Sequence, residues 1–166
     1  AKIKDRYPGL SYVIIGKREK GEYFKYLTEL VQKFGLGGRV FFLEGVNDED
    51  LVEYYNQSVF FVLTPVTTES HIEGFGMVYI EAGACKKPVI GFRDTGAEAP
   101  IIDGYNGFLV PYQDEERLGR AMSFLLDHSE EAGRMGENGR RRAEEFRWET
   151  IVDNYLEVYH KVLKER

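Results

Sequence analysis

Short, almost wholly apolar runs recur along the first half of the chain, and each is followed by a segment with helical character. The runs lie at residues 11–16, 39–43, 59–63 and 88–92. Strands that are apolar on both faces are typical of parallel sheets, which helices cover on both sides. The pattern therefore predicts a doubly wound α/β fold, a Rossmann-like three-layer domain with a parallel sheet and helices on both faces.

The helices are expected between these runs and after the last one. Asn47 or Asp48 is the expected N-cap of the second helix, because side chains of this kind accept hydrogen bonds from the first turn. A short helix should follow the turn at Asp94–Gly96, and charged pairs mark the last predicted segment. The longer helices are predicted at 21–34, 48–55, 74–85, 114–127 and 130–166.

Length and charge limit the classes of function. A chain of 166 residues is expected to form one domain. Its formal net charge of −6 argues against general nucleic-acid binding, which favours a basic face. Cys85 is the single cysteine, so a disulfide framework is excluded and a reducing, cytoplasmic location is expected. No apolar run approaches the roughly 20 residues of a membrane-spanning helix.

A ligand is expected where the parallel strands end. In open α/β sheets, ligands bind beyond the carboxyl ends of the strands. The loops at that edge would be residues 16–22, 44–48, 65–76 and 93–98. The segment from Glu73 to Glu81 begins in one of these loops and continues into a helix, so it is the strongest candidate for a site.

Glu81 is the only charged residue from Met77 to Cys85. Burying an unpaired carboxylate there would be costly, so a partner is expected. The turn Gly74–Gly76 exposes amide groups at a helix start, which favours a diphosphate. Glu81 could then accept both vicinal hydroxyls of a ribose, and Glu73 could meet the group that hangs from the distal phosphate.

A simpler interpretation remains open from the residues alone. In that interpretation Glu73 is a solvated loop residue and Glu81 pairs with a lysine or arginine. Similar alternatives apply to the basic residues Lys17, Arg18, Lys20 and Arg93, which either contact a phosphate or lie in solvated loops.

The segment EGFGMVYIEAGACKKPVI, residues 73–90, resembles the signature of retaining glycosyltransferases of the GT-B fold. This is the glycosyl transferases group 1 family, which contains glycogen-synthase relatives and bacterial lipid mannosyltransferases. Further segments with counterparts in that family lie at 13–16, 40–45, 103–107 and 146–159. The resemblance thus covers almost the whole chain. It implies that residues 1–166 are a nucleotide-sugar donor-binding domain, truncated at its N-terminal edge, from a longer protein.

The resemblance also implies roles for individual residues. Glu73 would be catalytic. The residues expected at the donor sugar and diphosphate are Glu73, Gly74, Phe75, Gly76 and Met77, with the amides of Phe75, Gly76 and Met77 as donors. The residues expected at the nucleotide are Gly16, Gly45, Val46, Val78 and Glu81, of which Glu81 would hold the ribose hydroxyls.

The implied reaction moves a hexose from a nucleotide-diphosphate sugar to an acceptor with retention, by a same-face route through an oxocarbenium-like state. Positioned dipoles would stabilise the leaving group. The nucleotide sugar is a substrate, and neither a cofactor nor a metal is expected. The implied partner is an N-terminal acceptor domain of the same protein. Membrane-associated relatives further suggest a peripheral contact of the full-length enzyme with the inner face of the membrane.

Three departures from the family pattern limit the transfer of these roles, and other functions stay open. The Arg-x4-Lys pair that clamps the diphosphate is absent, and the loop from Val66 to Ile72 is longer than the usual Pro-Ser-x-x-Glu entry. The usual Gly-Gly-x-x-Glu turn is Thr95-Gly-Ala-Glu-Ala99. The alternatives are a non-catalytic nucleotide-sugar binding module and a nucleotide-sugar epimerase. A dinucleotide-dependent oxidoreductase is disfavoured because no G-x-G-x-x-G follows the first strand.

Overall fold

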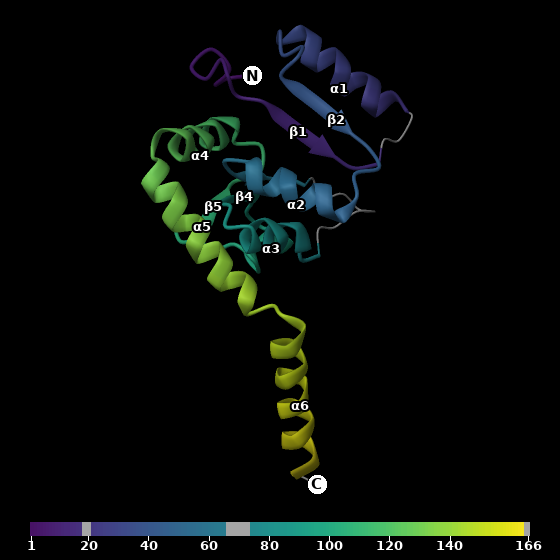
Figure 1. Ribbon diagram of the computed structural model, residues 1–166, viewed down its shortest axis with the longest axis vertical. Helices are drawn as coiled ribbons and strands as arrows, with labels where there is room; N and C mark the ends of the chain where they lie inside the picture. Colours follow the sequence, from purple (N-terminus) through teal and green to yellow (C-terminus); the bar gives the residue numbers. More distant parts are fainter. Residues whose placement is uncertain (18–20, 66–73, 165–166) are drawn as a thin grey trace. The chain divides into compact units, whose positions relative to one another are not determined.

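The computed structural model describes residues 1–17, 21–65 and 74–164. The chain divides into two compact units, Ala1–Glu53 and Tyr54–Arg166. Figure 1 shows the elements of each unit, and the two units are described separately below. In the described residues no helix is both long and apolar enough to cross a bilayer.

The first unit pairs two parallel strands and packs a helix against them. Strands β1 (Tyr12–Ile15) and β2 (Val40–Leu43) are joined through helix α1 (Glu22–Lys33). The ring of Phe24 on α1 meets Phe42 on β2 edge-on, with 5.1 Å between centroids. The guanidinium of Arg39 donates to the carbonyls of Lys4, Tyr7 and Leu10. These bonds tie the N-terminal segment to the start of β2.

The second unit is built on a three-stranded parallel sheet in the order β3-β4-β5. Helix α2 (Asp48–Gln57) crosses the boundary between the units. Buried side chains from the sheet, α4 and α5 form the core, among them Ile90, Phe92, Val110, Leu125 and Met135. The remaining elements are β3 (Phe61–Val62), α3 (Met77–Ala84), β4 (Val89–Phe92), a 3-10 turn (Gly96–Glu98), β5 (Gly107–Val110), α4 (Glu115–Asp127), α5 (Ser129–Glu144) and α6 (Trp148–Lys164).

Helices α3 and α5 approach each other closely enough that glycine is required at the contact. A Cβ on Gly83 would lie 2.9 Å from the carbonyl oxygen of Gly139. One turn earlier on α5, a Cβ on Gly136 would lie 2.1 Å from the carbonyl oxygen of Lys86. Lys86 itself has φ 58°, and the amide of Lys87 donates to Ala82 at 3.0 Å. This left-handed turn ends α3 directly at the contact.

The predicted parallel α/β fold is confirmed, with differences at the ends of elements. The strand expected at 59–63 is limited to Phe61–Val62, and the described strands form two hydrogen-bonded sheets. The helix expected at 74–85 begins at Met77, because Gly76 adopts a left-handed conformation with φ 74°. The predicted helical segment 130–166 is interrupted after Glu144, where α5 ends and the chain turns before α6.

Replacing a glycine at the contact between α5 and the end of α3 should destabilise the protein, whereas replacing an exposed glycine of α5 should not. Gly136→Ala should lower the free energy of unfolding by about 1–3 kcal/mol or more, because its methyl group overlaps the Lys86 carbonyl. Gly133→Ala is the matched control on the same helix: its Cβ would meet nothing within 4 Å, and its helix propensity should add up to about 1 kcal/mol. Urea denaturation measures both. Equal effects of the two substitutions would contradict the packing argument.

Candidate functional site

The N-terminus of α3 begins on a glycine. Gly76 is the N-cap, with φ 74° and ψ 59°, a left-handed conformation that glycine adopts without strain. A glycine has no side chain with which to cap the helix, so the first-turn amides of Met77 and Val78 can serve an external acceptor. The helix dipole adds partial positive charge at this end, and the two effects together suit an anion.

One narrow face of α3 is accessible, and it carries the predicted ligand residues. Met77 and Glu81 are exposed and Val78 is half-buried. The other faces are covered, since Tyr79, Ile80, Ala82 and Gly83 are buried. Residues three and four apart share a helix face, so these three side chains form one stripe. Glu81 follows the N-cap by five residues, which corresponds to about 7.5 Å along the helix axis.

Glu81 has a partner, as the sequence predicts, but that partner is a tyrosine and Glu81 is not buried. The carboxylate is exposed, so the argument from burial was wrong. Its Oε2 accepts a hydrogen bond of 3.1 Å from the hydroxyl of Tyr55 on α2. Among the described residues, no lysine or arginine forms an ion pair with Glu81, so the simpler interpretation of this residue is also not supported.

Phe75 connects the Gly74–Gly76 turn to the end of α5. Its ring meets Phe146 edge-on, with 5.1 Å between centroids. The guanidinium of Arg142 lies over the ring of Phe146, 4.7 Å from its centre. Arg142 Nη2 also donates to the carbonyl of Ala99 at 2.6 Å. The turn before α3 is therefore supported by residues near the chain's C-terminal helices.

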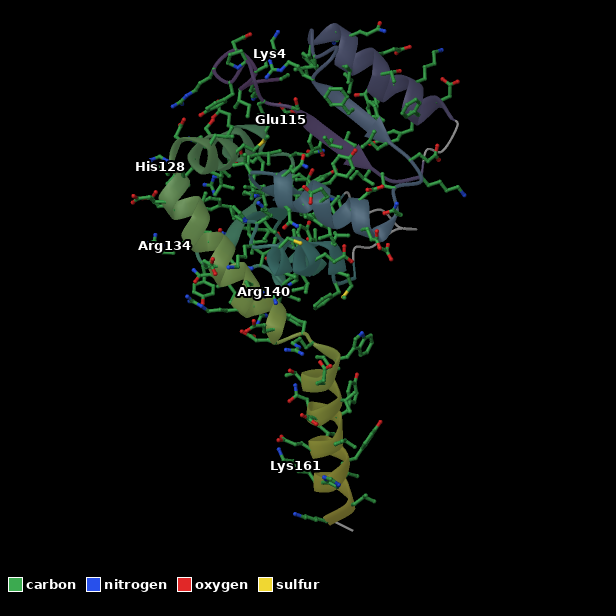
Figure 2. The ribbon with its side chains drawn as sticks, viewed as in Figure 1. Lys4, Glu115, His128, Arg134, Arg140 and Lys161 are labelled. Atoms are coloured by element: carbon green, nitrogen blue, oxygen red, sulfur yellow. The ribbon has the colours of Figure 1, made fainter. Side chains whose placement is uncertain are left out.

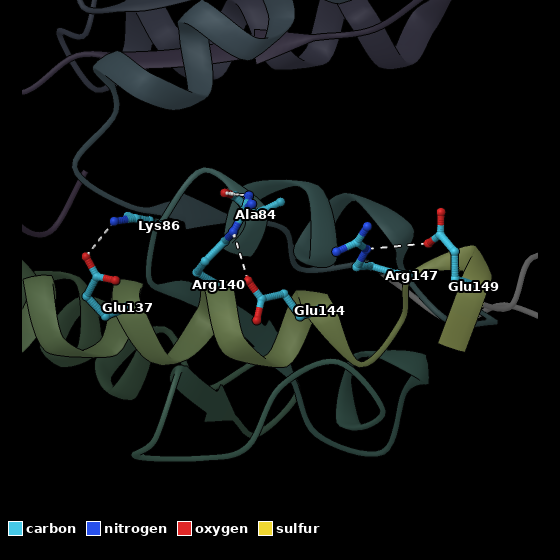
Figure 3. Close-up of polar contacts among 7 residues, drawn as sticks. All are labelled: Ala84, Lys86, Glu137, Arg140, Glu144, Arg147 and Glu149. Atoms are coloured by element: carbon cyan, nitrogen blue, oxygen red, sulfur yellow. Dashed lines mark hydrogen bonds and ion pairs between the residues drawn. The ribbon is translucent and has the colours of Figure 1, made fainter. Parts of the chain in front are cut away.

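Two positive side chains, Arg140 and Lys86, lie at the C-terminal end of α3. Figure 2 shows Arg134 and Arg140 on α5, and in Figure 3 Arg140 reaches across to the last turn of α3. Arg140 donates to the carbonyl of Ala84 at 2.8 Å, and Lys86 pairs with Glu137 at 2.9 Å. These cations complement the negative end of the helix dipole. Arg140 therefore links α5 to the last turn of α3.

The loop after β4 is held together by its own charged residues. Arg93, considered above as a phosphate contact, pairs with Asp103, whose other oxygen accepts the amide of Leu109 at 2.9 Å. Glu98 accepts the amide of Asp94 at 3.1 Å, so the acidic residue that departs from the family spacing closes its own turn. In the structure both side chains therefore brace the loop.

The predicted nucleotide residues of the first unit lie where its strands end. Gly16 follows β1, and its amide donates to Leu43 at the end of β2 at 3.1 Å. Gly45 follows β2 with φ 69°, and Val46 beside it is half-buried. Gly16 and Gly45 are exposed, and a Cβ on either would meet nothing within 4 Å. All three residues belong to the first unit.

The remaining predicted residues belong to the second unit or lie outside the described residues. The residues on α3 or in the turn directly before it are Gly74, Phe75, Gly76, Met77, Val78 and Glu81. Glu73 lies outside the described residues, as do Arg18 and Lys20. The catalytic role of Glu73 stays a prediction.

Sequence reasoning missed two residues that contact the site. Tyr55 lies 26 residues before Glu81, and the sequence predicted it only as the last residue of a helix. Phe146 follows a charged helix and has no local pattern that points to Phe75. An aromatic residue beside a helix break was the available signal for Phe146, and for Tyr55 there was none.

Comparison with known proteins identifies the family. The sequence model described as "Glycosyl transferases group 1" matches residues 1–142. The chain belongs to this family. It is 30% identical to the GDP-mannose-dependent alpha-(1-6)-phosphatidylinositol monomannoside mannosyltransferase of Mycolicibacterium smegmatis, over 89% of this chain and 39% of that protein.

Solved structures of glycosyltransferases share the fold. Sucrose-phosphate synthase from Thermosynechococcus elongatus is 32% identical with a TM-score of 0.74, over 93% of this chain and 39% of the other. Alr3699/HepE of Anabaena, in complex with UDP and glucose, is 25% identical with a TM-score of 0.75, over 92% and 41%. The chain therefore spans about two fifths of the length of these glycosyltransferases.

Removing the ring that supports Phe75 should loosen the turn before α3. Phe146→Ala should speed hydrogen exchange at the amides of residues 74–77, because Phe75 loses its edge contact. Trp148→Ala is the control: this neighbouring side chain is 79% exposed, so exchange at 74–77 should not change. The measurement is hydrogen–deuterium exchange by mass spectrometry, with peptides from β4 reporting on global stability. Unchanged exchange in Phe146→Ala would show that the turn does not depend on this contact.

Proposed function

We propose that this chain is the donor-binding half of a retaining glycosyltransferase, which moves a hexose from a nucleotide-diphosphate sugar to an acceptor. Membership of the glycosyl transferases group 1 family supports the glycosyltransferase class. The nucleotide donor is supported by two relatives, the GDP-mannose-dependent enzyme and the structure with bound UDP and glucose. The acceptor domain would lie in the part of the full-length protein beyond this chain.

The observation that carries the proposal is the accessible face of α3. A glycine-capped helix start and an exposed carboxylate lie on the same helix, about 7.5 Å apart along its axis. The amides at the start suit a diphosphate, and the carboxylate accepts hydrogen bonds from hydroxyl groups. A nucleoside diphosphate offers both groups in one molecule, with its phosphates at one end of the ribose.

The proposed chemistry is electrostatic. As the bond between sugar and phosphate breaks, negative charge develops on the departing diphosphate, and fixed amide dipoles stabilise that charge. The amides of Phe75, Gly76 and Met77 are the proposed donors, and Phe75 is held by Phe146. Glu73, immediately before this turn, is the proposed catalytic carboxylate at the donor sugar.

Replacing Glu81 should weaken binding of the nucleotide in the full-length protein. Glu81→Ala should raise the Kd for UDP, GDP or ADP, whichever the protein binds, by about 10-fold to 100-fold, because hydrogen bonds to a charged group are lost. Glu116→Ala removes an exposed carboxylate of α4 and should leave the Kd unchanged. Isothermal titration calorimetry gives both values. An unchanged Kd in Glu81→Ala would contradict the proposed ribose contact.

Replacing Glu73 should separate turnover from binding. Glu73→Ala should depress the rate of sugar transfer more than it weakens binding of the nucleoside diphosphate, because its proposed contact is to the donor sugar. Product formation from a panel of nucleotide sugars is measured together with calorimetry. Equal losses in both would refute the assigned role. Binding without any transfer by the wild-type protein would favour a non-catalytic module, and release of free nucleotide without an acceptor-linked product would favour an epimerase.

A further inference from the structure

Tyr55 is a buried residue whose hydroxyl group donates a hydrogen bond to the exposed residue Glu81. The side chain is 8% exposed and is the buried residue of α2. Its hydroxyl donates to Glu81 Oε2 at 3.1 Å. A glutamate on a helix surface otherwise samples several rotamers. A fixed donor therefore selects, among these, the rotamers that keep the carboxylate beside α2.

The ring of Tyr55 is held by a series of aromatic contacts. It meets Phe61 of β3 edge-on at 5.7 Å, and Phe61 in turn meets Tyr79 of α3 at 5.7 Å. The hydroxyl of Tyr79 donates to the carbonyl of Leu63 at 2.7 Å. Contacts from three elements thus converge on these rings. The donor to Glu81 is part of the packed interior and is not a mobile surface group.

The backbone next to Tyr55 is also tied down. The hydroxyl of Ser58 donates to the carbonyl of Tyr55 at 2.8 Å. Lys87, which follows α3, donates through Nζ to the carbonyl of Asn56 at 2.8 Å. The C-terminal end of α2 is therefore tied to the turn that follows α3, so the hydroxyl of Tyr55 has a defined position relative to α3.

Tyr55 stays a donor at neutral pH. Burial, and secondarily the negative charge of Glu81, raise the pKa of its phenol above the ordinary value of 10.0. The proton therefore remains on the tyrosine, and the hydrogen bond keeps one direction. Glu81 is engaged through Oε2, while a carboxylate has acceptor sites on both oxygens. Acceptor capacity remains for the hydroxyl groups of a ligand.

We propose that Tyr55 is a positioning residue, which holds the Glu81 carboxylate in the orientation that receives the ribose hydroxyls of the nucleotide. This inference rests on the proposed function, since it assumes that Glu81 meets a ribose. Tyr55 itself does not need to contact the ligand. It reduces the rotamer freedom that Glu81 would otherwise lose when the nucleotide binds.

The test compares ribose with 2′-deoxyribose in the full-length protein. Calorimetry gives the Kd for UDP and 2′-deoxy-UDP, and for GDP and 2′-deoxy-GDP, and the ratio within a pair measures recognition of the 2′-hydroxyl. Wild type should prefer the ribose form, and Glu81→Ala should lose most of that preference. Tyr55→Phe should reduce the preference by about 3-fold to 10-fold, the scale of immobilising one flexible side chain. It should raise the Kd of the deoxy form less than that of the ribose form, because the deoxy form keeps only its 3′-hydroxyl to contact Glu81.

Tyr54→Phe is the matched control, because it removes a hydroxyl from the preceding residue of the same helix, whose side chain is 39% exposed. It should behave as wild type. If wild type and Tyr55→Phe show the same preference while Glu81→Ala loses it, the inference on Tyr55 is overturned and the proposed function stands. If Tyr55→Phe weakens both forms equally, its role is only structural and the inference is likewise overturned. If wild type shows no preference, or binds neither pair, the proposed ribose contact fails and the inference falls with it.

Discussion

The close approach of α5 to α3 positions the candidate site of the second unit. The backbones meet at Gly83 and Gly139, where a Cβ on Gly83 would lie 2.9 Å from the Gly139 carbonyl oxygen and a Cβ on Gly139 would lie 3.2 Å from the Cα of Gly83. Helix α3 is only eight residues long, and an isolated helix of that length is marginal in water. Its stability must therefore come from packing. Because the backbone of α5 contacts the backbone of α3 directly, α3 has little room to shift or rotate.

The C-terminal end of α3 takes part in this packing, whereas its N-terminal end carries the proposed site. At the C-terminal end, the left-handed turn at Lys86 and the cation of Arg140 satisfy the last carbonyls. At the N-terminal end, Gly76 provides a tight turn and no capping side chain. Phe75 is supported there by Phe146 and, through it, by Arg142. The proposed site thus lies at the N-terminal end of a helix whose other end is fixed by packing.

The elements of the fold could be predicted from local pattern, whereas the contacts of the site could not. Apolar runs located the strands, and a capping side chain located α2, with Asn47 as the residue that accepts the amide of Asp50. The start of α3 was misjudged because a glycine leaves both helical and left-handed conformations open. The bond from Tyr55 to Glu81 depends on how α2 returns toward α3, and no periodicity within either helix contains that information. The sequence motif pointed to Glu81, but its burial was wrongly inferred from its apolar neighbours.

The exposure of Glu81 explains why a charged residue can occur in so apolar a helix. Tyr79, Ile80, Ala82 and Gly83 are apolar or small because the rest of the unit covers them, while Glu81 occupies the one stripe that stays accessible. Without a ligand, the carboxylate is therefore exposed to solvent while it accepts the hydrogen bond from Tyr55. A ligand that covers it must replace the lost water with hydrogen-bond donors, or binding is opposed by desolvation of a charge. A pair of vicinal hydroxyls meets this requirement and an apolar group does not. The exposure of Glu81 therefore supports the proposed ribose contact as much as its charge does.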